Sequence, residues 1–288
     1  MQPYQHTANF VPALWTGWIA RPDRGRLRLT GTDAVEFLQA LVTNDVAALG
    51  LGESCDALLL TPQGRMIADL SVFRGRDEVV LSVPAALAEA LTLRLDFLVF
   101  TEDVQIANAS QLIHQITLVR DAMAETQDLY YDATGEPALM AQLREAGIEQ
   151  ISPEVAEAMR IKAGRPAWGL DMNEETIPLE AGLLDRSISQ TKGCYPGQEV
   201  IVRVLHRGGG RVAKRLMRIN FPFEQMDVPP AGTAITIDGA DIGRITSAVH
   251  TSNRAQVVAL GYVQRDHAVE GTDVMVAAAP AVVGAACG

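Results

Sequence analysis

A single loop concentrates the residue types that could do chemistry in this chain. It reads Lys192-Gly193-Cys194-Tyr195-Pro196-Gly197-Gln198-Glu199 and brings a thiol, an amine, a carboxamide and a carboxylate together. Its glycines and its proline shape the backbone, because glycine adopts positive φ and proline fixes φ. If the next segment is helical, Cys194 lies just before a helix N-terminus with Lys192 beside it, and both favour the thiolate. The pattern predicts a reactive thiol or, alternatively, a small residue in a tight turn.

Glu180 is a second candidate, because it is a carboxylate in the apolar, turn-rich segment 177–183. A carboxylate is costly to bury unless a partner binds it. A buried carboxylate can accept two adjacent N–H donors of a ligand, which is a charge-assisted pairing. A glutamate near a turn can instead cap a helix or lie at the surface.

Basic residues cluster after the loop. Such a patch can be the solvated face of a strand or helix, or it can receive an anionic part of a ligand. His206 is close to Cys194 in the sequence, but a Cys–His nucleophile pair is defined by contact in space. The patch comprises Arg203, His206, Arg207, Arg211, Lys214, Arg215 and Arg218.

The composition argues against several functional classes. The formal net charge of −11 disfavours direct binding of nucleic acid, which depends on lysine and arginine at the phosphates. Cys55, Cys194 and Cys287 form neither a CxxC pair nor a zinc-ligand spacing. We therefore expect no disulfide scaffold, no resident metal and a reducing compartment. No apolar run reaches the roughly 18 residues of a membrane span, and the N-terminus does not resemble a secretion signal. A cytoplasmic protein without a membrane partner is expected.

Mixed strands and helices must position these residues. Residues 1–24 show no period, and Trp15 and Trp18 are expected to form an N-terminal flap. Asp33 and Glu36 have the spacing of a reciprocal helix cap. Turn residues at 61–65 separate two strands, which makes the sheet at least partly antiparallel. Strands are expected at 27–29, 58–60, 66–73, 78–83, 104–107 and 116–119, and helices from Asp33, from Pro84, at 138–146 and at 153–163.

The character of the sequence changes after residue 210. Short β-prone runs follow one another between turn-forming residues, which is typical of a small antiparallel barrel or sandwich. The apolar stretch 274–288 is interpreted as a last strand with a frayed end. Strands and helices alternate without a strict βαβ rhythm, which favours an α+β fold with a domain boundary near 208–210. The turn-forming residues are Pro229, Pro230, Asp238, Gly239, Gly243 and Gly261.

The loop motif Lys192-Gly193-Cys194-Tyr195-x-Gly197-Gln198-Glu199 resembles the signature of the YgfZ family. These proteins are relatives of the glycine-cleavage T-protein that bind folate and support iron–sulfur proteins. Further blocks resemble family blocks in the family order, from about residue 25 to about residue 265, and an ordered set is more specific than one motif. The blocks are Leu29-x-Gly31-x-Asp33 with Phe37-Leu38-Gln39, Thr43-Asn44-Asp45-Val46, Thr61-Pro62-Gln63-Gly64-Arg65 and Ile177-Pro178-Leu179-Glu180-Ala181-Gly182-Leu183.

The resemblance implies a fold, a cofactor and partners. The fold would be α+β, with a glycine-cleavage T-protein-like folate-binding body over residues 1–207 and a C-terminal antiparallel β-barrel over residues 208–288. The cofactor would be tetrahydrofolate or a one-carbon derivative of it, and the basic patch would receive its anionic glutamate tail. The partners would be iron–sulfur enzymes or assembly proteins.

The resemblance also assigns roles to site residues. Cys194 and Lys192 would carry the chemistry. Glu180 would accept adjacent N–H groups of the pterin, as the matching glutamate does in the T-proteins. Asp69 resembles one position of the acidic pair that T-proteins use at the folate nitrogens, and Ala68 replaces the other member of that pair. The expected folate-binding residues are Glu180, Asp69, Tyr195, Gln198, Glu199 and Arg207, of which Gln198 and Glu199 could instead hold Cys194 in place.

Three functions stay open. The first is a tetrahydrofolate-binding accessory protein for the assembly or repair of iron–sulfur enzymes, including those that modify tRNA. Cys194 would then exchange thiols, ligate cluster iron transiently or react with a folate-borne carbon, since three scattered cysteines do not make the four-cysteine set of a resident cluster. The second is a folate-dependent aminomethyltransferase of glycine cleavage, which Ala68 disfavours. The third is a binding module whose thiol loop only shapes an interface.

Overall fold

The protein is described from a computed structural model. The structure describes residues 5–6, 14–120, 125–206, 209–223, 227–251 and 256–288. The chain forms two compact units. Unit 1 comprises Met1–Leu60, Ile67–Ile151 and Arg186–Pro196, and unit 2 comprises Thr61–Met66, Ser152–Asp185 and Gly197–Gly288. The predicted domain boundary between residues 207 and 208 lies outside the described residues and stays a prediction.

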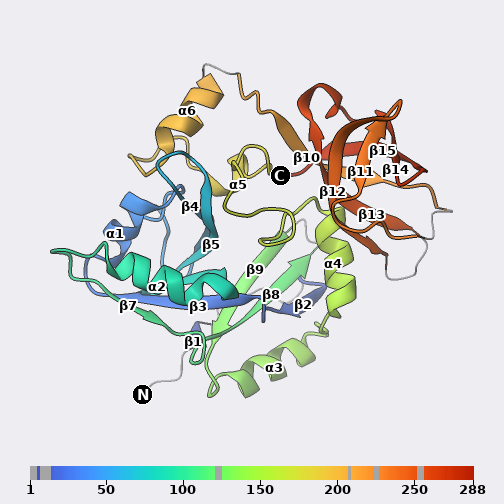
Figure 1. The fold of residues 1–288 in the computed structure, drawn as a ribbon. Coiled ribbons are helices and arrows are strands. Elements are labelled where there is room, and N and C mark those ends of the chain that lie inside the picture. The colour runs from blue at the N-terminus through green and yellow to red at the C-terminus, as the bar shows by residue number, and fades with distance from the viewer. Residues whose placement is uncertain (1–4, 7–13, 121–124, 207–208, 224–226, 252–255) are drawn as a thin grey trace. The chain divides into compact units, whose positions relative to one another are not determined.

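Unit 1 is built on two β-sheets (Figure 1). Its strands are β1 (Gln5–His6), β2 (Gly17–Ala20), β3 (Arg24–Thr30), β4 (Ser54–Leu60), β5 (Met66–Arg74), β6 (Glu78–Pro84), β7 (Gln105–Asn108), β8 (His114–Arg120) and β9 (Glu125–Tyr131). One sheet has the order β4-β5-β6-β3-β7 and the other the order β1-β9-β8-β2. The pairs β3–β6, β3–β7 and β5–β6 are antiparallel, which confirms the prediction made from the turn residues.

Helices cover one face of each sheet in unit 1. The helices α1 (Ala34–Leu41) and α2 (Ala88–Asp96) share an apolar cluster with alternate residues of β3, β5 and β6. A short 3₁₀ turn, η2 (Ala85–Leu87), leads into α2. The helix α3 (Glu136–Glu145) packs instead on the second sheet, against Ile116, Leu118 and Leu129. Each sheet therefore turns its other face toward its neighbour.

The facing sides of the two sheets carry polar side chains. Ser82 Oγ of β6 donates a hydrogen bond to Gln115 Oε1 of β8 at 2.8 Å. Ser71 Oγ of β5 donates one to Asp128 Oδ2 of β9 at 3.0 Å. Arg24 of β3 lies in the same layer and is also buried. Because buried polar groups require bonded partners, these hydrogen bonds fix how the two sheets pack.

Two local predictions in unit 1 are wrong. Trp18 does not belong to a flap, because β2 pairs with β8 from Gly17↔Val119 to Ala20↔Ile116. The helix α1 does begin after Asp33, but no side-chain hydrogen bond caps it, so the expected cap with Glu36 is absent. The Asp33 carboxylate accepts the backbone N–H of Asp103 at 2.8 Å instead, since the loop before β7 packs against it.

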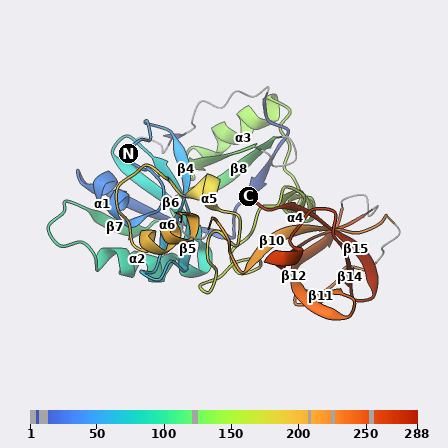
Figure 2. The same cartoon turned by 90° about the horizontal axis from the view of Figure 1, so that it is seen from above.

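Unit 2 contains a closed barrel of six antiparallel strands, whose ring is visible in Figure 2. The strands are β10 (Lys214–Asn220), β11 (Ala234–Ile237), β12 (Ala240–His250), β13 (Val257–Gln264), β14 (Asp273–Val276) and β15 (Ala279–Ala286). Their order around the barrel is β10-β13-β12-β11-β14-β15. Aliphatic side chains such as Ile235, Val263 and Val283 fill the interior, because alternate strand residues point inward. The predicted α+β fold with a C-terminal antiparallel barrel is thus confirmed.

Helices of unit 2 and the linking segments complete the chain. They are α4 (Pro153–Lys162), α5 (Leu184–Ser187), α6 (Gln198–His206) and the 3₁₀ turn η4 (Arg265–His267), of which α5 belongs to unit 1 in part. Ser152 caps α4 by accepting the N–H of Val155, and Gly164 with φ 68° follows its end. This confirms the helix that was expected at 153–163.

The last residues do not form the frayed end that was expected. The backbone N–H of Cys287 donates to Leu216 O at 3.0 Å, and the thiol is buried. Gly182 lies so near that a Cβ there would be 1.9 Å from the carbonyl oxygen of Cys287. Burial raises the pKa of the Cys287 thiol to about 12.

Asp171 joins α4 to the barrel within unit 2. Its buried carboxylate accepts from Arg160 Nη1 at 2.6 Å and from the hydroxyls of Thr246 and Ser247 at 2.5 and 2.6 Å. We expect Asp171→Ala to destabilise unit 2 by about 3 kcal/mol, because two hydroxyls lose an acceptor and Arg160 loses one of its two carboxylate partners, keeping Glu157. Urea unfolding measures this, with the exposed Asp266→Ala as control. Equal midpoints for the two variants would contradict the structural role given to Asp171.

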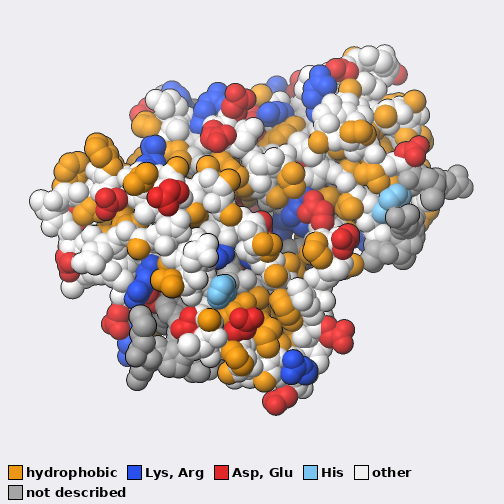
Figure 3. Space-filling view, turned by 60° about the horizontal axis from the view of Figure 1, so that its bottom comes forward, with side chains coloured by type: hydrophobic (Ala, Val, Ile, Leu, Met, Phe, Trp, Pro, Cys, Tyr) orange, Lys and Arg blue, Asp and Glu red, His pale blue; other side chains and the backbone are white. Residues whose placement is uncertain are grey.

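The surface shown in Figure 3 carries acidic and basic side chains interspersed, with no continuous basic area on that face. This agrees with the formal net charge of −11. Among the described helices, none combines the length and the apolar character that a membrane crossing requires.

Candidate functional site

The signature loop lies between α5 and α6. Cys194 is exposed, and α6 begins at Gln198, so the segment after the thiol is helical as predicted. Gln198 and Glu199 form the first turn of that helix. In unit 2, α6 packs tightly on the turn at 61–65, because a Cβ on Gly64 would lie 2.9 Å from the Val200 side chain. Gly64 also has φ 75°, which glycine adopts without strain.

Lys192 is buried and points into unit 1. Its Nζ donates to the carbonyl oxygens of Gln39 and Val42 at 2.5 Å each and of Asn44 at 3.2 Å. These carbonyls lie in and just beyond the last turn of α1, where backbone acceptors lack partners within the helix. Burial lowers the pKa of Lys192, while nearby Asp45 opposes the shift. The ammonium thus anchors the thiol loop to α1, and its predicted catalytic role stays a prediction.

Tyr195 packs beside that anchor. The Lys192 Nζ lies 5.4 Å from the centroid of its ring, and the ring is buried. This is a cation–π contact of ordinary range. Burial raises the pKa of the Tyr195 hydroxyl, so the hydroxyl stays neutral at physiological pH. Lys192 and Tyr195 hold the loop backbone on both sides of Gly193 and Cys194.

Replacing Lys192 tests the anchor. We expect Lys192→Met to lower the stability of unit 1 by about 3 kcal/mol, because three carbonyl oxygens lose a charged donor. Denaturant unfolding measures the loss, and Lys162→Met, at an exposed position of α4, is the control. An unchanged midpoint for Lys192→Met would show that the ammonium does not anchor the loop.

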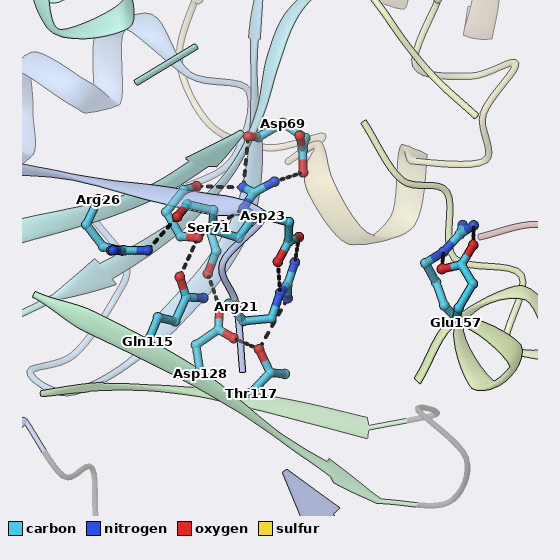
Figure 4. Close-up of polar contacts among 12 residues, drawn as sticks. Arg21, Asp23, Arg26, Asp69, Ser71, Gln115, Thr117, Asp128 and Glu157 are labelled. Atoms are coloured by element: carbon cyan, nitrogen blue, oxygen red, sulfur yellow. Dashed lines mark hydrogen bonds and ion pairs between the residues drawn. The ribbon is translucent and has the colours of Figure 1, made fainter. Parts of the chain in front are cut away.

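Asp69 of β5 lies in the polar layer of unit 1 (Figure 4). Its Oδ2 accepts from Arg24 Nη1 at 2.8 Å, and its backbone oxygen accepts from Arg24 Nη2 at 3.1 Å. Its other carboxylate oxygen, Oδ1, is buried and has no hydrogen-bond partner among the described residues. A buried carboxylate oxygen without a partner is unfavourable, so the group can accept a further N–H donor. The adjacent Ala68 is fully buried in the apolar cluster on the opposite face.

The layer around Asp69 contains arginines that sequence reasoning missed. Arg21 pairs with Asp23 at 2.8 Å and donates to Thr117 Oγ1 at 3.2 Å (Figure 4). Arg24 and Arg26 are largely buried. The signal was present in the sequence. Arginines alternate with Leu27 and Leu29 along β3, and strand residues two apart point to the same face.

Glu180 of unit 2 is buried at 7% exposure and sits in a turn that starts at Ile177. The turn is fixed to the barrel, since Leu216 N–H donates to the backbone oxygen of Glu180 at 2.8 Å. Its carboxylate makes no hydrogen bond or ion pair within the part of the chain that the structure describes. Burial raises the pKa of Glu180, and the cations Lys214 and Arg65 oppose that shift. Glu180 is therefore neither a surface residue nor a cap of α5.

The described residues of the basic patch lie on two elements of unit 2 and, for Arg211, on the segment between them. Arg203 and His206 lie on α6, whereas Lys214, Arg215 and Arg218 lie on β10. Lys214 Nζ is 4.5 Å from the ring centroid of Tyr262, and Arg218 Nη1 donates to Lys162 O at 3.0 Å. Arg207, expected to bind folate, lies outside the described residues. Two of these side chains thus have partners within the protein.

The expected site residues fall into three groups. Lys192, Cys194 and Tyr195 share the loop of unit 1, Asp69 lies in the polar layer of that unit, and Glu180, Gln198 and Glu199 belong to unit 2. The functional role predicted for each of these residues stays a prediction. Over the described stretches of the chain, no three His, Cys, Asp or Glu side chains are arranged to hold a metal ion.

Two segments of the chain match domain families of known proteins. Residues 23–120 match the family described as the GCVT N-terminal domain, and residues 214–286 match the glycine cleavage T-protein C-terminal barrel domain. The Arabidopsis thaliana protein named "Putative transferase At1g60990, chloroplastic" is 26% identical over 294 residues, covering 88% of this chain and 66% of that protein. The chain thus spans just under two thirds of that relative's length.

Other relatives are named as aminomethyltransferases. One from Synechocystis sp. is 28% identical over 300 residues, covering 88% of this chain and 78% of that protein. The crystal structure of glycine cleavage system aminomethyltransferase T from Bartonella henselae has the same fold, with a TM-score of 0.78 and 19% identity. The match covers 97% of this chain and 87% of that chain. Since both matched domains occur in this order and the fold agrees, the protein belongs to the glycine-cleavage T-protein-like family.

Proposed function

We propose that the protein is a tetrahydrofolate-binding accessory factor of the YgfZ type, which supports the assembly or repair of iron–sulfur enzymes. The observation that carries the folate part is Glu180, a buried carboxylate that no hydrogen bond or ion pair satisfies within the described residues. The pterin ring offers adjacent N–H donors, and a carboxylate accepts such a pair with charge assistance. Binding would give this carboxylate the N–H donors that the described residues do not provide.

Asp69 supports the same proposal independently. Its Oδ1 is buried without a partner among the described residues, while its Oδ2 is held by Arg24. One oxygen is thus committed to the protein and the other can accept an N–H of the folate. Tyr195, Gln198, Glu199 and Arg207 are proposed as further folate contacts, and the basic residues of α6 and β10 as the acceptors of its anionic tail.

Cys194 carries the proposed accessory role. It is exposed on a loop that a buried lysine anchors, and a thiol that acts on a partner must be accessible. It can exchange thiols with a partner protein, ligate cluster iron transiently or attack a folate-borne carbon. The other two thiols are less suited to this, because burial raises the pKa of both Cys55 and Cys287 to about 12. A higher pKa leaves less of the nucleophilic thiolate.

Folate-dependent aminomethyl transfer is the second candidate, favoured by the names of the relatives. The acidic pair expected for it is incomplete. Ala68 is fully buried on the apolar face of β5 and points away from Asp69, so this position does not distinguish the two functions. We place the accessory role first because aminomethyl transfer has no need of the exposed thiol loop that carries Cys194.

Calorimetry tests the folate binding that both functions require, and two further assays separate them. Calorimetric titration of the unchanged protein with tetrahydrofolate should show saturable binding, and its absence would contradict both. The purified protein supplied with an aminomethyl donor and tetrahydrofolate should form no one-carbon folate, while its gene should restore iron–sulfur enzyme activity to cells that lack the protein. Rapid transfer without such rescue would favour the aminomethyltransferase.

The proposed setting is the cytoplasm, with folate and iron–sulfur proteins as partners. The acidic net charge of −11 supports the absence of direct nucleic-acid binding, because phosphate contacts depend on basic residues. A role in tRNA modification would accordingly be indirect, through iron–sulfur enzymes that act on tRNA.

A further inference from the structure

Arg24 is the residue that fixes the carboxylate of Asp69. It lies on β3 with 8% exposure, and its guanidinium makes four hydrogen bonds. Two reach Asp69, at Oδ2 (2.8 Å) and at the backbone oxygen (3.1 Å). The other two reach Ser82, at Oγ (3.1 Å) and at the backbone oxygen (2.7 Å). A planar guanidinium with this many partners has little freedom to move, so it determines where Oδ2 lies.

The support for Arg24 extends into the second sheet. Ser82 Oγ accepts from Arg24 Nε and donates to Gln115 Oε1 of β8 at 2.8 Å. Gln115 is itself buried at 5% exposure, and its Nε2 has no partner among the described residues. The hydrogen-bonded chain Gln115–Ser82–Arg24–Asp69 thus runs from the core of unit 1 to the carboxylate. Its two ends, Gln115 and Asp69, are labelled in Figure 4.

Asp69 is left with one committed and one uncommitted oxygen. Because Arg24 binds Oδ2 and the backbone of the same residue, rotation of the carboxylate would break a charge-assisted bond. The free oxygen Oδ1 is therefore presented in one orientation. A ligand N–H that approaches it meets an acceptor that is already ordered, which reduces the entropy lost on binding.

We propose that Arg24 is a positioning residue, which orients Asp69 so that Oδ1 accepts an N–H group of the folate. The inference rests on the proposed binding of folate and goes beyond it, because Arg24 itself need not touch the ligand. Its contribution is to the geometry of the acceptor. Without Arg24, Asp69 keeps its charge and loses its fixed direction.

Arg26 provides a matched control. It lies two residues along the same strand, on the same face, with the same 8% exposure. Its guanidinium donates only to carbonyl oxygens, those of Ile113, Arg24 and Ser110, at 2.7, 2.5 and 2.6 Å. It therefore contributes to the fold of the polar layer as Arg24 does, but it makes no contact with Asp69.

The test measures tetrahydrofolate affinity by calorimetry for the full chain and its variants, with thermal unfolding of each. We expect Arg24→Gln to weaken binding about tenfold, the usual effect of losing a charge-assisted hydrogen bond, and Arg26→Gln to leave it within about twofold. Asp69→Asn should weaken binding about tenfold in the unchanged protein, and about tenfold again when it is added to Arg26→Gln. Added to Arg24→Gln, it should weaken binding by less than about threefold further, because the effects of neighbouring residues that act together are not additive.

A purely structural role would give another pattern. Arg24→Gln and Arg26→Gln would then lose stability and folate affinity to the same extent, and Asp69→Asn would weaken binding about tenfold in both variants. That pattern would overturn the inference about Arg24 and leave the proposed binding of folate standing. Should Arg24→Gln not fold, Arg24→Lys replaces it; lysine keeps the charge without the planar fork and is expected to lose about threefold. Wild-type affinity in Arg24→Lys would likewise overturn it. No binding by the unchanged protein would overturn the proposed function and this inference together.

Discussion

Glu180→Gln should weaken tetrahydrofolate binding by about tenfold or more. Glutamine keeps the size of the side chain but removes the charge that makes the bonds from pterin N–H groups strong, and it places an NH₂ group where an acceptor is needed. The loss should be large because Glu180 is 7% exposed and none of the described residues donates a hydrogen bond to its carboxylate. Calorimetric titration of both proteins measures the ratio of the dissociation constants.

The control for this substitution is Glu174→Gln. Glu174 belongs to the same segment of unit 2 but is exposed, so its replacement should leave the affinity unchanged. Both variants remove one negative charge, which separates a specific contact from a general change in electrostatic attraction. Equal affinities for Glu180→Gln and the unchanged protein would remove Glu180 from the folate site.

The affinity should also depend on pH. Burial raises the pKa of Glu180 above its ordinary value near 4.3. As the pH falls, the carboxylate therefore begins to gain a proton at a higher pH than an exposed glutamate, and protonation removes an acceptor. We expect binding to weaken on the acid side of neutrality in the unchanged protein. In Glu180→Gln this part of the pH dependence should be absent.

Cys194→Ala should fold normally and fail to restore iron–sulfur enzyme activity in cells that lack the protein. Cys194 is exposed, so alanine removes no core contact and should change the free energy of unfolding by no more than about 0.5 kcal/mol. The reactive sulfur, by contrast, is lost entirely. Enzyme activity in cell extracts measures the rescue, and thermal unfolding of the purified variant measures the fold.

Cys55→Ala is the matched control. It also removes one thiol from unit 1, but burial raises the pKa of that thiol to about 12, which suppresses the thiolate. We expect Cys55→Ala to rescue the cells and Cys194→Ala not to. Full rescue by Cys194→Ala would mean that the loop only shapes an interface, the binding-module alternative.

Local sequence patterns predicted most elements of the fold. Apolar spacing identified α2, whose Leu91 and Leu95 are buried, and the turn residues at 61–65 predicted the strands on both sides. These features depend on neighbours along the chain, which the sequence displays. The strand β9 was missed, because its first half, Glu125–Asp128, is polar, and Asp128 faces the polar layer between the sheets.

The errors came from contacts between residues far apart in the sequence. Asp33 had the spacing of a helix cap, yet its carboxylate accepts the backbone N–H of Asp103, seventy residues later in the chain. Cys287 looked like part of a frayed end, yet Gly182 and Leu216 bury it. Composition and spacing cannot reveal such partners, since each depends on how the whole unit folds.

In the candidate site too, residue types and motifs could be identified from the sequence, but contacts between distant residues could not. Cys194 and Glu180 could be identified from residue type and motif, whereas the arginine that holds Asp69 could not be assigned a partner from its position in the sequence. Its position two residues before Cys194 predicted that Lys192 lies beside the thiol. In the structure its ammonium donates instead to the carbonyl oxygens of Gln39 and Val42 at the end of α1. A charge next to a cysteine in sequence need not act on that cysteine.

Glu180 as the acceptor of the pterin is tested most directly by a crystal structure of the protein saturated with tetrahydrofolate. The predicted result places two pterin N–H nitrogens about 2.7–3.2 Å from the two carboxylate oxygens of Glu180. A pterin bound elsewhere, with Glu180 free of it, would contradict the proposed folate site.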